Sequence, residues 1–142
     1  MDDYILNKSI KHLSKDPKIN SIIKKYPIPQ FSYNDNYFEA LSKSIIYQQL
    51  SVKVAKIIYM RFLSLFKKKI PTPYHYLNIN ISDLSAIGLS KQKINYINNL
   101  SNFFIQNSNI VNFKTDSDKD IVKRLMAIKG IGQWTVDMFM MF

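Results

Sequence analysis

The residues best suited to chemistry form a short segment near the end of the sequence, Lys129-Gly130-Ile131-Gly132-Gln133. It holds two of the three glycines of the chain, between apolar residues at helical spacing. Glycine at both positions predicts a tight turn of positive φ, with the N–H groups of Ile131, Gly132 and Gln133 free at a helix start. Such amides bind anions such as phosphate, and Lys129 adds a positive charge. A plain connection between two antiparallel helices would use the same glycines, so a structural role stays open.

Charge and cysteine content narrow the function classes. The 142 residues include 20 Lys and Arg against 10 Asp and Glu, a formal net charge of +10. This excess favours a polyanionic partner such as nucleic acid, although a Lys-rich composition from AT-rich coding sequence explains it equally well. The sequence contains no cysteine, which excludes disulfides, cysteine metal sites and iron–sulfur clusters.

The chain length and its first residues predict one intracellular domain. A chain of 142 residues can bury one sizeable core, so we expect a single domain over residues 1–142. The start, Met1-Asp2-Asp3-Tyr4, is acidic and lacks the features of a secretion signal, and no apolar run reaches membrane-spanning length. We therefore expect no membrane association, and we expect a monomer.

Apolar residues recur at helical spacing along the chain, and no alternating run predicts a strand, which favours an all-α fold. Ser51 and Ser90 are predicted N-caps. One helix is expected to end in the lysines 67–69, a loop to begin at Pro71, and a short helix capped by Ser82 or Asp83 to close at Gly88. The helix before the glycine segment is expected to start at Asp116, Ser117 or Asp118, with Ile121, Leu125 and Ile128 on its buried face.

Three motifs, in the same order, resemble those of the helix-hairpin-helix DNA glycosylases, specifically the 3-methyladenine DNA glycosylase branch. The segment Lys129-Gly130-Ile131-Gly132-Gln133-Trp134-Thr135 resembles the hairpin of that family. Ser44-Ile45-Ile46-Tyr47-Gln48-Gln49-Leu50-Ser51 is similar to its "IxxQQLS" helix junction, and Gly88-Leu89-Ser90-Lys91-Gln92-Lys93 to its "GLSxxK" turn. The likeness runs from about His12 to the final residue.

The resemblance implies a monofunctional enzyme that hydrolyses the N-glycosidic bond of alkylated purines in double-stranded DNA, with 3-methyladenine the leading substrate. It needs no cofactor, and it is expected in the cytoplasm at the nucleoid of a bacterium or archaeon, or in a eukaryotic nucleus. A non-catalytic DNA-binding module is the first alternative. A helical interaction domain with incidental charge is the second.

The resemblance also assigns roles to side chains that act on the duplex. Such an enzyme must extract its base, fill the vacated space and hold the extruded base in a pocket. Gln49, with Leu50 beside it, matches the residue that wedges into the duplex, although Gln49 could instead cap the preceding helix. Trp134 and Tyr47 are the expected walls of the base pocket, although a sole tryptophan is more often part of a core.

Trp134 occupies the position at which family members that also cut the DNA backbone carry a Schiff-base lysine. Tryptophan cannot form an imine, but it can stack on a positively charged, alkylated base. The resemblance further implies a Na⁺ or K⁺ ion held by the backbone carbonyls of Met126, Ile128 and Ile131.

Catalysis in the family depends on an aspartate that stabilises the developing sugar cation. The resemblance places it beyond Phe142, so the fold is expected to be a helix-hairpin-helix glycosylase domain that is incomplete at its C-terminal end. We expect no catalytic residue and no glycosylase activity in the 142 residues. Asp137 lies within the helix after the hairpin, which is not the catalytic position.

Overall fold

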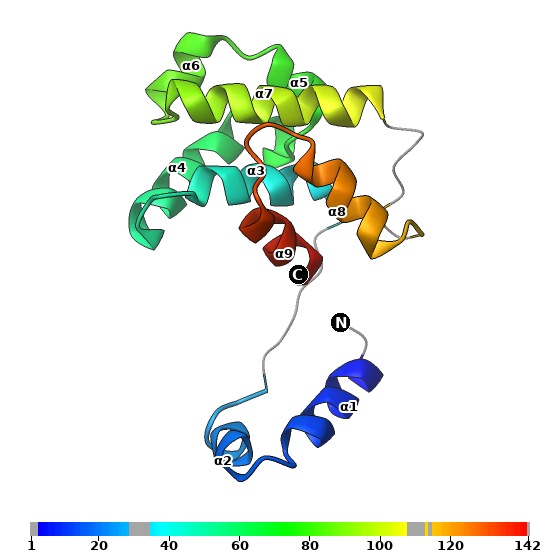
Figure 1. Ribbon diagram of the computed structural model, residues 1–142. Coiled ribbons are helices and arrows are strands. Elements are labelled where there is room, and N and C mark those ends of the chain that lie inside the picture. Colours follow the sequence, from blue (N-terminus) through cyan, green and yellow to red (C-terminus); the bar gives the residue numbers. More distant parts are fainter. Residues whose placement is uncertain (1–2, 29–34, 108–112, 114, 142) are drawn as a thin grey trace. The chain divides into compact units, whose positions relative to one another are not determined.

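The computed structural model describes residues 3–28, 35–107, 113 and 115–141 (Figure 1). Contacts divide the chain into two compact units, residues 1–35 and residues 36–141. The regular elements described in both units are all helical, which confirms the all-α fold class. Within the described ranges, no helix has the length and apolar character needed to cross a bilayer. The expectation of a single domain over residues 1–142 stays a prediction, and Phe142 lies outside the described residues.

The first unit contains two helices, α1 (Asp3–Leu13) and α2 (Pro17–Lys25). The carboxylate of Asp16 accepts the N–H groups of Lys18 and Ile19 at 2.8 and 3.2 Å, and Pro17 occupies the first helical position. Both features start a helix, because the carboxylate satisfies free N–H groups and proline needs no donor there. No residue of α2 is buried.

The second unit is built around α3 (Tyr37–Tyr47), which packs against three other helices. These are α4 (Val52–Ser64), α7 (Lys91–Gln106) and α9 (Gln133–Met141). The remaining elements are the 3-10 turn η1 (Lys67–Lys69), α5 (Pro73–Leu77), α6 (Ile81–Ala86) and α8 (Asp118–Met126). In Figure 1, α6 lies above α7 and α3 below it, and Tyr76 of α5 packs against Phe38 of α3 with ring centroids 6.4 Å apart.

One hydrophobic core joins the helices of the second unit. Its largest fully buried side chains include Tyr76, Phe62 and Leu41, which come from three different helices. The predicted buried positions of α8 and the following turn, Ile121, Leu125 and Ile128, all belong to this core. Burial of such side chains supplies most of the free energy that holds the helices together.

Several predicted helix ends are confirmed. The hydroxyl groups of Ser51 and Ser90 accept backbone N–H groups at the starts of α4 and α7. Gly88 has φ +101°, and the N–H groups of Gly88 and Leu89 close the end of α6 by donating to Ser85 and Leu84. This bonding pattern is a Schellman motif, and it requires a left-handed residue at the glycine position.

Three predicted ends differ from the structure. The N-cap of α6 is Asn80 rather than Ser82 or Asp83. Helix α4 ends at Ser64, before the lysines, because the chain turns there to bury Phe66, whose ring centroid lies 4.9 Å from that of Phe62. The segment after Pro71 is not all loop, since the Thr72 hydroxyl caps α5 and the buried Tyr76 secures it to the core.

Candidate nucleic-acid interface

The hairpin, residues 127–132 between α8 and α9, uses its two glycines for different reasons. Gly130 has φ +110°, and a Cβ atom built on it would stand 2.2 Å from Cγ of Tyr96. Gly132 has no positive φ, and a Cβ built there would meet nothing within 4 Å. The prediction of positive φ at both glycines is therefore wrong for Gly132, because only the first bends the chain. The second leaves open space beside the backbone at the start of α9.

Of the three backbone N–H groups predicted to be free, that of Ile131 is hydrogen-bonded. The N–H of Ile131 donates to the carbonyl oxygen of Ile128 at 3.0 Å, so it closes the turn and is not free. Ile131 is also buried. Gly132 and Gln133 stand at the start of α9, where the first N–H groups have no carbonyl partner within the helix. These two amides, with the exposed Lys129 nearby in the chain, form the part of the hairpin that an anion can reach.

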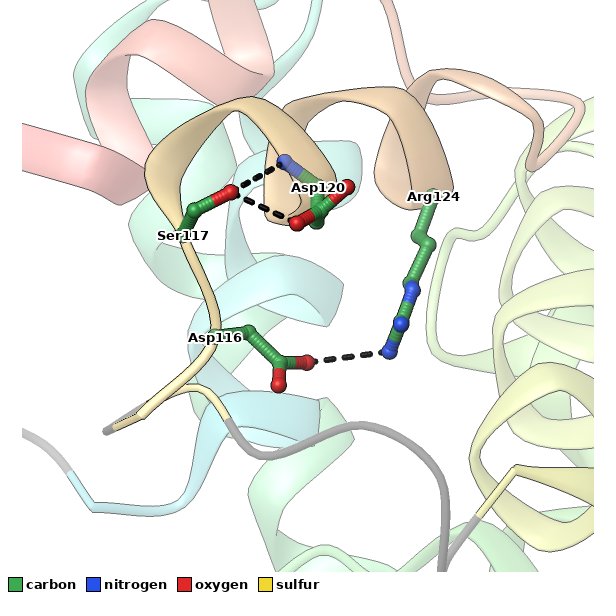
Figure 2. A network of polar contacts seen from close by, with 4 residues as sticks. All are labelled: Asp116, Ser117, Asp120 and Arg124. Carbon is green, nitrogen blue, oxygen red and sulfur yellow. Dashed lines mark hydrogen bonds and ion pairs between the residues drawn. The ribbon is translucent and has the colours of Figure 1, made fainter.

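The start of α8, which leads into the hairpin, is fixed by the polar network in Figure 2. The Ser117 hydroxyl accepts the N–H of Asp120 at 3.3 Å and donates to its carboxylate at 2.6 Å. The guanidinium of Arg124, later in the same helix, forms an ion pair with the carboxylate of Asp116, at an N–O distance of 2.9 Å. Of the three predicted starting residues, Ser117 is the N-cap, because its side chain reaches the third N–H of the helix.

Two neighbouring helices hold the hairpin in place. The side-chain amide of Gln48 donates to the carbonyl oxygen of Gly130 at 3.1 Å and to the hydroxyl of Thr135 at 3.3 Å. Asn99 of α7 donates to the carbonyl oxygen of Lys129 at 3.2 Å. These contacts bind otherwise unsatisfied carbonyl groups, so they orient the hairpin relative to α3 and α7.

The wedge turn, residues 47–50 between α3 and α4, contains a left-handed residue that is not glycine. Gln48 has φ −54° and ψ 131°, Gln49 has φ 56°, and the N–H of Leu50 lies 3.4 Å from the carbonyl oxygen of Tyr47. These values describe a type II turn, in which the third residue is usually glycine. Gln49 and Leu50 are both exposed. The C-cap of α3 is Gln48. The alternative role for Gln49, as the cap of that helix, is therefore wrong.

Lys93 of α7 reaches the same turn. Its ammonium group donates to the carbonyl oxygens of Ile46 and Gln48 at 2.7 and 2.8 Å. Partial burial lowers the pKa of Lys93 from its ordinary value. The cation stands at the C-terminal end of α3, where free carbonyls and the helix dipole favour positive charge.

The two predicted pocket residues differ in their surroundings. Trp134 is 63% exposed in the first turn of α9, so it is not part of the core formed by the described residues. Tyr47 is partly buried, and its ring centroid lies 6.2 Å from that of Tyr59 on α4. The Tyr59 hydroxyl donates to the carboxylate of Glu39 at 2.5 Å, and the ammonium of Lys43 lies 5.9 Å from the Tyr47 ring centroid. Tyr47 thus contributes to the contact between α3 and α4, and its role as a pocket wall stays a prediction.

The residues that hold the site were not identified from the sequence. Lys93 is part of a recognised motif, yet nothing in that motif indicates its contact with a turn 45 residues earlier. Tyr96 and Asn99 follow at helical spacing on the same helix, and their residue types indicate no special role. Only their position opposite the hairpin distinguishes them.

Metal-ligating side chains do not gather anywhere in the described ranges, where no group of three or more His, Asp or Glu residues could hold an ion. A monovalent ion would depend on carbonyl oxygens instead. The carbonyl oxygen of Ile128 accepts the N–H of Ile131, and its second lone pair is available to a cation. The ion expected on the carbonyl oxygens of Met126, Ile128 and Ile131 therefore stays a prediction.

Comparison with known proteins places this geometry in a family. The model of the HhH-GPD superfamily of base excision DNA repair proteins matches residues 42–136, a range that includes the wedge turn, Lys93 and the hairpin. The chain belongs to this superfamily. It is 32% identical over 110 residues to DNA-3-methyladenine glycosylase 1 of Schizosaccharomyces pombe, covering 74% of this chain and 47% of that protein. It is 28% identical over 152 residues to the DNA-3-methyladenine glycosylase of Saccharomyces cerevisiae, covering 94% of this chain and 51% of that protein.

Solved structures of the superfamily have the same fold. The crystal structure of a DNA-3-methyladenine glycosidase from Bacillus halodurans matches with TM-score 0.75 and 33% identity, over 92% of this chain and 60% of that chain. The S. pombe enzyme in complex with abasic DNA matches with TM-score 0.80 and 28% identity, over 95% of this chain and 69% of that chain. The chain spans about half the length of the curated relatives it matches.

Proposed function

We propose that this HhH-GPD chain binds double-stranded DNA and forms part of a monofunctional DNA glycosylase that acts on alkylated purines, with 3-methyladenine the leading substrate. The reaction is hydrolysis of the N-glycosidic bond, which releases the base and leaves an abasic site. Relatives named as DNA-3-methyladenine glycosylases support the substrate class, and the S. pombe relative has been solved with abasic DNA.

Trp134 is the single observation that carries the proposal. Trp134 is mostly exposed and stands directly after the amides of Gly132 and Gln133, so its ring is open to a ligand that the hairpin holds. A purine that carries a positive charge gains cation–π attraction when it stacks on an indole ring. Indole has no amine to form an imine with the sugar, so the reaction ends with base release.

The wedge turn and the hairpin have complementary tasks in this proposal. The amides of Gly132 and Gln133, with Lys129, bind backbone phosphates and carry no sequence preference. Gln49 enters the duplex and fills the space left by the extruded base, which lowers the cost of extrusion. A Na⁺ or K⁺ ion on the carbonyls of Met126, Ile128 and Ile131 would add positive charge beside the phosphate. The protein would act as a monomer on the DNA of the nucleoid or nucleus, with no other cofactor.

Binding to three matched duplexes tests the proposal. The duplexes differ at one position, which is guanine, 7-methylguanine or a tetrahydrofuran abasic analogue, and affinities come from fluorescence anisotropy. We expect the chain to prefer both altered duplexes over the intact one. Trp134 is the only tryptophan, so quenching of its fluorescence by the 7-methylguanine duplex reports stacking directly. Equal affinities for all three duplexes would instead favour the non-catalytic module.

The chemical step has its own measurements. Release of free 3-methyladenine from methylated DNA is followed by chromatography. We expect release by a chain extended to the length of its relatives and none by the 142 residues alone, with Trp134→Ala as the control for pocket binding. Borohydride is added in parallel, because it traps an imine as a covalent protein–DNA adduct. We expect no adduct, and a covalent product would show that the assignment as a monofunctional enzyme is wrong.

A further inference from the structure

The ammonium group of Lys93, on α7, hydrogen-bonds to the backbone of the wedge turn. This contact favours one backbone conformation of the turn over another. Type I and type II turns differ mainly in the orientation of the central peptide group. In the wedge turn this group joins Gln48 to Gln49, and its carbonyl oxygen is the one that Lys93 binds at 2.8 Å. A donor on that oxygen stabilises one orientation of the peptide. The orientation observed is the one that gives Gln49 its positive φ.

Positive φ at glutamine needs such support. The left-handed conformation is unfavourable for a residue with a side chain, because Cβ then lies too close to the following carbonyl oxygen. Hydrogen bonds to a charged group exceed neutral ones in strength, and Lys93 makes two, to Ile46 and Gln48. The burial that lowers the pKa of Lys93 also strengthens these contacts, because less water competes for them.

Gln48 connects the same peptide to the hairpin. Its backbone carbonyl binds Lys93, while its side-chain amide binds the carbonyl of Gly130 and the hydroxyl of Thr135. One residue therefore joins the wedge turn, α7 and the start of α9. The position of Gln49 relative to the hairpin amides depends on this junction.

We propose that Lys93 is a positioning residue for base extrusion: its ammonium selects the peptide orientation that aims Gln49 at the duplex held by the hairpin. This inference rests on the proposed function, because Gln49 has a task only if a base is extruded. Lys93 itself touches neither the base nor the sugar, and it acts through the Gln48–Gln49 peptide.

The free protein provides a test that needs no DNA. In NMR spectra, a type II turn has a strong NOE from the Hα of Gln48 to the amide proton of Gln49, whereas a type I turn has a strong amide-to-amide NOE between them. We expect Lys93→Met, which keeps the length of the side chain and removes its donors, to shift the pattern toward type I. Lys93→Arg should restore it. Lys91→Met changes the same charge two residues away on an exposed side chain and should leave the pattern unchanged.

DNA binding provides the second test. Lys93→Met should lower the preference for the abasic duplex over the intact duplex by about tenfold, the effect of losing hydrogen bonds to a charged group. Gln49→Ala should lower it similarly, and the double variant should be no worse than Gln49→Ala alone. Lys91→Met should weaken both complexes equally, since it changes only the long-range charge.

The outcomes separate the two proposals. An unchanged NOE pattern in Lys93→Met, or an effect on preference that adds fully to that of Gln49→Ala, would overturn the role of Lys93. A wild-type chain without preference for the abasic duplex, combined with the expected NOE change, would overturn base extrusion and keep the selection of the turn. If Lys93→Met does not fold, as judged by circular dichroism, Lys93→Leu gives the same comparison, because leucine also has no hydrogen-bond donor.

Discussion

The ring of Tyr96 on α7 lies where a side chain at Gly130 would begin, because a Cβ atom there would stand 2.2 Å from its Cγ. Real Cβ atoms essentially never approach so closely, so the hairpin can sit this near to α7 only with glycine at that position. Gly132, two residues on, has no such neighbour. The two glycines therefore serve different purposes, the first in folding and the second in leaving the backbone accessible.

Gly130→Ala should destabilise the fold. The left-handed backbone costs about 1–2 kcal/mol and the overlap with Tyr96 about 1–3 kcal/mol, so the free energy of unfolding should fall by about 3 kcal/mol. Thermal and urea denaturation measure this loss. In a Tyr96→Ala background only the backbone part should remain, and an equal loss in both backgrounds would show that the ring is not responsible.

Gly132→Ser should weaken DNA binding with little effect on stability. Serine is a favourable N-cap, so α9 can start as before, within about 0.5 kcal/mol. The added side chain occupies the open space that a phosphate would enter. We expect the slope of log affinity against log salt to become shallower by about one unit, the effect of one lost phosphate contact. An unchanged slope would remove Gly132 from the interface.

Binding to intact duplex should depend steeply on salt. If about four phosphates are neutralised, the affinity should fall about a hundredfold between 50 and 200 mM salt. Lys129→Gln should make the slope shallower by about one unit. Lys119→Gln is the matched control, because Lys119 is exposed at the opposite end of α8 from the hairpin. Anisotropy titrations across the salt series measure both variants, and a flat response would contradict the phosphate model.

Trp134→Ala should leave the unfolding midpoint nearly unchanged, since the side chain is mostly exposed. The preference for 7-methylguanine over guanine should fall about tenfold, which corresponds to the loss of one aromatic stacking contact. Trp134→Phe should retain part of the preference, because phenylalanine still has a ring face. A large loss of stability without loss of preference would assign the tryptophan to folding.

Two tyrosines should resist ionisation until the protein unfolds. Burial raises the pKa of Tyr76 above its ordinary value of 10.0, and burial together with the Glu39 carboxylate raises that of Tyr59. Each folded-state pKa lies above the unfolded value, so the stability they contribute is present below about pH 10 and lost as the pH rises further. Absorbance of tyrosinate during alkaline titration should show these two ionising only with the loss of helical circular dichroism. Tyr59→Phe and Tyr76→Phe should each reduce by one the number of tyrosines that ionise only on unfolding.

Features that depend on neighbouring residues could be predicted from the sequence. Helical spacing of apolar residues located the buried face of α8, and the hydroxyl side chains at Ser51 and Ser90 marked helix starts. Gly88 marked the left-handed end of α6. Each depends on backbone geometry within a few residues, which residue type controls directly. The hairpin motif identified the family for the same reason, since its pattern is contiguous.

Features that depend on which helices meet were decided only by the tertiary structure. Gln48 reaches Gly130 across 82 residues, and Lys93 reaches the wedge turn across 45. A helical pattern says that a face is buried, but not which side chain lies opposite it. For this reason the sequence predicted two equivalent glycines, whereas the ring of Tyr96 makes one indispensable and leaves the other open. The exposure of Trp134 has the same origin, because only the packing of α9 against α3 and α8 determines which of its residues face water.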